Sequence, residues 1–136
     1  MKNSHRKCLL VDDDQDDREI FQIALDEIGS NIECYYYSNG IEAISGLRSS
    51  ISFPDIIFLD LNMPMMTGIQ CLIEIKKIEI ITLTPVIIYS TSSDPRFYSE
   101  AIMNGARDYI VKPNRLADLV TILKSIFNRE LGLLIL

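Results

Sequence analysis

Five short apolar runs alternate with five longer amphipathic stretches along this chain, and this alternation limits the fold more than any other feature. The runs 55–60 and 86–90 are apolar over 56–59 and 86–89, as expected for strands buried on both faces of a sheet. The stretch 16–29 repeats apolar residues every three or four positions, which predicts one face of a helix. The predicted strands are 8–11, 32–38, 55–60, 86–90 and 108–111, and the predicted helices are 16–29, 41–50, 68–80, 95–105 and 116–127.

Strands that alternate with helices in this order predict an α/β fold, in which a doubly wound, five-stranded parallel sheet carries helices on both faces. We therefore expect three layers, α, β and α. A chain of 136 residues has the length of one domain, so we expect a single domain over 1–136, with its core at about 6–130 and no output domain after it.

Charge and composition argue against several classes of function. The net charge of −6 is opposite to that of a nucleic-acid-binding surface. No apolar run approaches the roughly 20 residues that a membrane-spanning helix needs. Three dispersed cysteines and the lack of a secretory signal are typical of a reducing compartment. We therefore expect a cytoplasmic protein that binds neither nucleic acid nor membrane.

Polar side chains follow the predicted strands at the points where the strands end. The carboxyl ends of parallel strands meet at one edge of a sheet, so we expect these side chains to lie close together. They are Asp12, Asp13 and Asp14 after the first strand, Asp60 and Asn62 after the third, Ser90 and Thr91 at the fourth, and Lys112 with Pro113 after the fifth.

Carboxylates gathered at one edge need a compensating positive charge. Two of them about 4 Å apart repel by roughly 4 kcal/mol at an effective dielectric constant near 20. Oxygen ligands of this kind suit Mg²⁺. A lysine and a hydroxyl at the same edge complete the parts of a phosphoryl-transfer site. A carboxylate would be the acceptor, because no serine or cysteine here has a base partner and the only histidine, His5, lies in the N-terminal tail.

Four segments, in this order, resemble the receiver domain of bacterial two-component response regulators. They are "LLVDDD", "DIIFLDLNMPMMTG", "PVIIYS" and "GARDYIVKP", and the resemblance covers essentially the whole chain. It implies a flavodoxin-like sheet with the strand order 2-1-3-4-5 and a stand-alone receiver that works in phosphorelay signalling. Thr67 departs from the aspartate that the family often has before Gly68, at a position outside the phosphorylation chemistry.

The resemblance also assigns the chemistry. It implies that Asp60 accepts a phosphoryl group from the phosphohistidine of a sensor histidine kinase or a histidine phosphotransfer protein. Mg²⁺ would be the cofactor, bound by Asp12, Asp13, Asp60 and the backbone carbonyl of Asn62, with Asp13 the better candidate for a direct ligand than Asp12. The protein would catalyse only its own phosphorylation and dephosphorylation, so it would not be an enzyme in the usual sense.

A switch is implied as well. Lys112 would contact a phosphoryl oxygen, aimed inward by a cis peptide bond before Pro113. Ser90 would hydrogen-bond the phosphoryl group, and Tyr109 would change rotamer as Ser90 moves. A half-buried strand aromatic without a switching role is the competing interpretation of Tyr109. The surface of helix 95–105, strand 108–111 and helix 116–127 would then bind a downstream protein or a second copy.

Several other residues have simpler expected roles. Asp14 is expected to be solvated or to cap the following helix, and Asp16 and Asp17 are acidic charges that the dipole at a helix start favours. Ile122 and Ile126 fall off the main apolar stripe of helix 116–127. These isoleucines and the terminal "LGLLIL" would mediate contacts with partners, pack onto the core or fray.

Two other functions compete with this interpretation. An aspartate-nucleophile phosphatase of the haloacid dehalogenase type uses the same kinds of residue. Its nucleophile is the first aspartate of a DxD motif, however, and Asp12 with Asp14 matches it only loosely, with no following hydroxyl and no cap domain. A receiver-like module that binds partners without phosphorylation is the other alternative. The complete set of residues argues against it.

Overall fold

The computed structural model of the protein describes residues 5–29, 31–50, 52–133 and 135. Its five strands form one parallel sheet in the order β2-β1-β3-β4-β5, which confirms the predicted fold class and strand order. The strands are β1 (Arg6–Val11), β2 (Ile32–Tyr37), β3 (Ile56–Leu59), β4 (Val86–Ser90) and β5 (Asp108–Val111).

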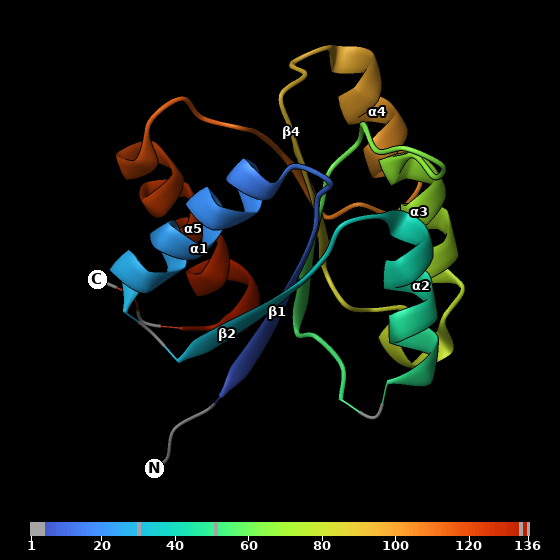
Figure 1. Cartoon of the computed structure of the whole chain (residues 1–136), viewed down its shortest axis with the longest axis horizontal. Coiled ribbons are helices and arrows are strands. Elements are labelled where there is room, and N and C mark those ends of the chain that lie inside the picture. The colour runs from blue at the N-terminus through green and yellow to red at the C-terminus, as the bar shows by residue number, and fades with distance from the viewer. Residues whose placement is uncertain (1–4, 30, 51, 134, 136) are drawn as a thin grey trace.

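Helices cover both faces of this sheet, with α1 and α5 on one side and α2, α3 and α4 on the other (Figure 1). No helix in the described part of the chain is both long enough and apolar enough to cross a bilayer. The helices are α1 (Gln15–Ile28), α2 (Gly40–Ser49), α3 (Gly68–Lys76), α4 (Pro95–Met103) and α5 (Leu116–Leu131), and a short 3₁₀ helix, η1 (Glu79–Ile81), follows α3.

α3 and α5 show the largest differences in length from the sequence prediction. α3 ends at Lys76 because the Thr82 hydroxyl donates a hydrogen bond to the Lys76 carbonyl, and the chain then turns through η1. α5 runs on to Leu131, where Gly132 ends it in the left-handed conformation with φ 65°. Periodicity alone does not place such ends, which depend on capping contacts.

The sheet separates two apolar cores. Alternate residues of β1 point to opposite faces, so Leu9 and Val11 pack under α2 and α3, whereas Cys8 and Leu10 pack under α1 and α5. β3 is buried along its whole length, and so is β4. Burial on both faces explains why these strands are apolar throughout, and it holds their carboxyl ends rigidly.

The C-terminal segment packs onto the α1–α5 core. Ile126 is buried, and Ile122, Leu133 and Ile135 are partly buried against the same cluster. The Asn128 side chain donates to the Ile135 carbonyl at 3.1 Å and accepts from its backbone N–H at 2.9 Å. The expectation that Ile126 lies off the core is therefore wrong, because the apolar stripe of α5 is wider than the spacing suggested.

Candidate functional site

Adjacent strands at the centre of the sheet bring two buried aspartates together. Val11 pairs with Leu59, so Asp12 and Asp60 leave the sheet at the same level. The backbone N–H of Asp60 donates to the Val11 carbonyl at 2.9 Å. Asp12 is fully buried and Asp60 is 6% exposed. Among the described residues, Asp12, Asp13 and Asp60 each offer a carboxylate oxygen, and these oxygens lie within 4.8 Å of one another. The grouping predicted from the sequence is therefore present.

Burial raises the pKa of the two buried aspartates, Asp12 and Asp60. Burial, and after it the charge of Asp12, raises the pKa of Asp60 to about 7, and Asp13 adds to the rise. Lys112 and a hydrogen bond from the Asn62 backbone act in the opposite direction. Burial also raises the pKa of Asp12, against a lowering hydrogen bond from Lys112. The site therefore holds more negative charge than its own cation offsets.

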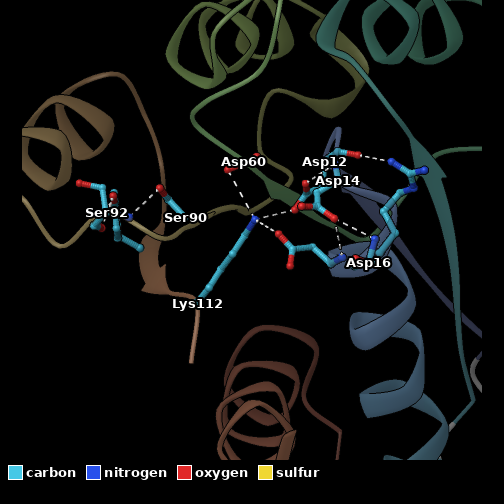
Figure 2. A network of polar contacts seen from close by, with 10 residues as sticks. Asp12, Asp14, Asp16, Asp60, Ser90, Ser92 and Lys112 are labelled. Atoms are coloured by element: carbon cyan, nitrogen blue, oxygen red, sulfur yellow. Dashed lines mark hydrogen bonds and ion pairs between the residues drawn. The ribbon is translucent and has the colours of Figure 1, made fainter. Parts of the chain in front are cut away.

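That cation is Lys112, whose side chain is only 9% exposed. Its Nζ lies 2.7 Å from Asp17 Oδ2, 2.8 Å from Asp12 Oδ2 and 3.8 Å from Asp60 Oδ1, and Figure 2 shows the side chain reaching toward Asp12 and Asp60. Burial lowers the pKa of Lys112, but hydrogen bonds to Asp12 and Asp17 outweigh it and raise that pKa above its ordinary value. Asp12, Asp13, Asp17, Asp60 and Lys112 together form the acidic cluster.

The loop after β3 can approach the site this closely only because it contains a glycine. A Cβ atom on Gly68 would lie 2.2 Å from the Asp60 carbonyl oxygen, so any side chain there would displace the backbone of the central aspartate. The Gly68 backbone N–H donates to the Leu61 carbonyl at 2.8 Å. Thr67 caps α3 in a capping box with Gln70. The threonine that departs from the family pattern thus has a structural role.

The family follows from comparison with known proteins. A model of the response regulator receiver domain matches residues 8–124. The chain belongs to the response regulator receiver family. A curated relative of this receiver, the two-component response regulator ORR8 of Oryza sativa subsp. indica, is 34% identical over 118 residues, which cover 87% of this chain and 95% of that protein.

Solved structures agree with this assignment. The phosphorylated cyanobacterial phytochrome response regulator RcpA shares 32% of its sequence with this receiver, with a TM-score of 0.86, over 95% of this chain and 96% of that one. The receiver domain of the sensor histidine kinase PA1611 from Pseudomonas aeruginosa PAO1 was crystallised with magnesium in its active-site cleft. It is 22% identical, with a TM-score of 0.78, over 96% of this chain and all of that one (100%), a likeness that shows the fold alone.

The residues predicted to switch the receiver share a neighbour. Ser90, at the end of β4, is completely buried. Its Oγ accepts a hydrogen bond from the Ser92 backbone N–H at 3.2 Å (Figure 2). The Tyr109 hydroxyl donates to the Ser92 carbonyl at 2.8 Å, and the Tyr109 ring lies 6.1 Å from that of Tyr98 on α4. Ser92 therefore links the two predicted switch residues.

One prediction about the site is wrong. No cis peptide bond occurs in the described residues, so the bond before Pro113 is trans. The trans isomer is the more stable form even before proline. Lys112 reaches Asp12 and Asp17 from this trans backbone, because its long side chain spans the distance.

Two further residues take part that sequence reasoning did not assign to the site. Asp17 was attributed to the helix dipole, but its carboxylate pairs with Lys112. Asp17 lies in the first turn of α1, close behind the carboxyl end of β1, and no local pattern in the sequence points to this pair. Arg18 Nη1 donates to the Asp12 backbone carbonyl at 2.7 Å, and the sequence offers no sign of this contact. Asp14 caps α1, which was one of the two roles expected for it.

Proposed function

We propose that this receiver accepts a phosphoryl group on Asp60 and that Mg²⁺ supports the transfer. Receiver domains are signalling modules of two-component systems, which interact with histidine kinases or phosphotransfer proteins. The observation that carries the proposal is the acidic cluster, in which the buried Asp60 lies against the buried Asp12 and close to Lys112. Phosphorylated RcpA, a relative with the same fold, supports it.

The residues of the cluster fit a divalent cation. Asp12, Asp13 and Asp60 supply oxygens close enough to share one ion, and burial, followed by the charge of Asp12, raises the pKa of Asp60. Asp13 is exposed, so it can meet an ion that still carries water. The backbone carbonyl of Asn62 would add a further oxygen. Bound Mg²⁺ would supply positive charge that draws the acceptor and the phosphoryl oxygens together.

The transfer itself needs one nucleophile and one departing nitrogen. A carboxylate oxygen of Asp60 attacks the phosphorus of a phosphohistidine, and a new P–O bond forms. The P–N bond breaks, its electron pair stays on the imidazole nitrogen of the donor, and that nitrogen takes a proton from solvent. Lys112 then pairs with a phosphoryl oxygen. The receiver promotes only this reaction and the later hydrolysis of its own acyl phosphate.

The link through Ser92 suggests how phosphorylation reaches the surface. When the Ser90 hydroxyl turns to a phosphoryl oxygen, its Oγ leaves the Ser92 N–H, and the loop that holds the Tyr109 hydroxyl is released. Tyr109 then moves toward the space that Ser90 vacated. A partner that prefers one of the two states shifts their populations.

The surface at which a partner would distinguish the two states would be formed by α4, β5 and α5. Large apolar side chains are exposed on α4, where Phe97 and Met103 are 38% and 85% exposed, and Val111 on β5 is 43% exposed. A downstream protein or a second copy of the chain would bind there. A place in the cytoplasm is a prediction that accompanies this proposal.

Incubation with Mg²⁺ and acetyl phosphate tests the proposal. We expect mass spectrometry to find one labile phosphate, and Asp60→Asn to abolish it, because the amide cannot act as the nucleophile. Label that persists in Asp60→Asn would refute the assignment. No label, together with no response to beryllofluoride and Mg²⁺, would instead favour a module that binds partners without phosphorylation. Turnover of small phosphate esters would indicate a phosphatase.

A further inference from the structure

We propose that Asp17 is a positioning residue that holds the Lys112 ammonium away from Asp60 until a phosphoryl group arrives. The inference rests on the proposed phosphorylation of Asp60. It adds a role for a residue at the start of α1 that the acceptor and metal assignments do not use. Asp17 thereby competes with the phosphoryl group for the Lys112 ammonium.

Distances from Lys112 Nζ carry the argument. The two contacts of hydrogen-bond length go to Asp17 Oδ2, at 2.7 Å, and to Asp12 Oδ2, at 2.8 Å, whereas Asp60 Oδ1 lies 3.8 Å away. The ammonium is thus bound between the two carboxylates on the β1–α1 side. To hydrogen-bond a phosphoryl oxygen on Asp60, it must move toward Asp60 and give up at least one of them.

Asp17 is the partner that Lys112 can leave more easily. The Asp12 side chain is completely buried, so leaving it without its cation would strand a charge inside the protein. The Asp17 side chain is 29% exposed and lies in the first turn of α1. Water and the helix dipole can stabilise this carboxylate once the lysine has gone. Phosphorylation therefore exchanges the Asp17 contact for a phosphoryl contact.

The chain offers a matched control on the same helical turn. Asp16 carries the same charge and is exposed, but the described ion pairs of Lys112 are with Asp12, Asp17 and Asp60. Asp16→Ala removes one negative charge near the site, as Asp17→Ala does, and leaves the Lys112 contact in place. Asp17→Glu keeps the charge and a carboxylate that the ammonium can reach. These variants distinguish the effect of the Asp17–Lys112 ion pair from the general electrostatic effect of one negative charge near the site.

The measurement is the dissociation constant of beryllofluoride, a mimic of the phosphoryl group, by fluorine NMR at saturating Mg²⁺, after the Mg²⁺ affinity of each variant is known. We expect Asp17→Ala to bind beryllofluoride about fivefold more tightly than wild type, because its lysine no longer has to leave a carboxylate. Asp16→Ala and Asp17→Glu should stay within about twofold of wild type.

Three results would overturn the inference. The first is an affinity of Asp17→Ala for beryllofluoride that is unchanged or weaker than that of wild type. The second is an equal gain in affinity in Asp16→Ala and Asp17→Ala. The third is a gain in affinity in Asp17→Glu that equals that of Asp17→Ala. In each of these cases wild type still binds beryllofluoride, so the proposed function stands. Failure of wild type to bind beryllofluoride, with no acetyl phosphate label on Asp60, would overturn the proposed function and this inference together.

Discussion

Two clusters of charged residues lie at opposite edges of the sheet, and only one of them is balanced. At the amino ends of β4 and β5, Glu130 has a side chain only 5% exposed, and it accepts from Arg107 Nε at 3.1 Å and from Arg129 Nε at 2.7 Å. Arg129 Nη2 also lies 3.2 Å from Asp108. This arginine cluster, made of Arg107, Asp108, Arg129 and Glu130, sets two cations against two carboxylates.

The acidic cluster at the carboxyl ends sets four carboxylates against one ammonium. The same fold thus satisfies a buried acid at one edge and leaves charge unsatisfied at the other. The unbalanced charge of the acidic cluster costs stability, although the arginine cluster shows that this fold can neutralise a buried acid. An imbalance that is kept at such a cost indicates function rather than structure. Unfolding measurements on variants of the two clusters test this difference in charge balance.

Removing the central cation should have the largest effect. We expect Lys112→Met to lower the free energy of unfolding of the metal-free protein by about 3–4 kcal/mol, because Asp12 would stay buried without a partner. Arg107→Met, the control, should cost less than about 1 kcal/mol, since Arg107 is largely exposed and Glu130 keeps Arg129. Urea unfolding at pH 8 measures the loss of stability in both variants. Equal losses would contradict the difference between the two clusters.

The pH dependence of stability tests the raised pKa of Asp60. Because that pKa is about 7 in the folded protein and 3.8 is its ordinary value, the folded state binds this proton more tightly than the unfolded chain. The stability of the metal-free protein should therefore fall as the pH rises from about 4 to 7. Asp60→Asn lacks this loss and should be more stable at pH 8 by on the order of 3 kcal/mol.

Urea unfolding of wild type and Asp60→Asn across this pH range checks the sign. The difference between the two proteins should grow from pH 4 to pH 7 and level off above it. A difference that does not change with pH would show that the Asp60 carboxylate is not strained by its neighbours.

Magnesium should stabilise the protein through the acidic cluster alone. At a concentration 100 times its dissociation constant, Mg²⁺ should raise the free energy of unfolding by about 2.7 kcal/mol. Asp13→Asn should lose most of this gain at the same concentration, while Asp108→Asn in the arginine cluster should keep it. Thermal unfolding at constant ionic strength measures the gain, and an equal gain in Asp13→Asn would remove Asp13 from the metal ligands.

The smallest effect should have the opposite sign to that of Asp60→Asn. Glu130→Gln replaces a carboxylate that two arginines satisfy with a neutral amide of the same shape. We expect it to lower the free energy of unfolding by about 1 kcal/mol, because both arginines are substantially exposed and part of their loss is recovered in water. Stabilisation by Glu130→Gln in urea unfolding would mean that this cluster, too, is strained.

Most residues of the site could be located from the sequence because each of them directly follows a strand, and the apolar pattern of these strands is easy to recognise. Asp12, Asp13 and Asp60 lie where β1 and β3 end, and parallel pairing brings such ends together. The partner of Lys112 was harder to find. Asp17 at a helix start has an ordinary explanation in the dipole, and the two residues are 95 positions apart. The isomer of the bond before Pro113 was inferred from the family and was wrong.

Local patterns in the sequence specify which elements form, in what order, and which side chains leave the sheet at its carboxyl edge. Local hydrophobic periodicity and short connecting turns are enough to specify these features. The division of one lysine's contacts among three carboxylates, at 2.7, 2.8 and 3.8 Å, depends instead on tertiary packing. Differences of about 1 Å between strong and weak ion pairs are set by how α1, β1 and β5 pack, and no local pattern encodes that packing.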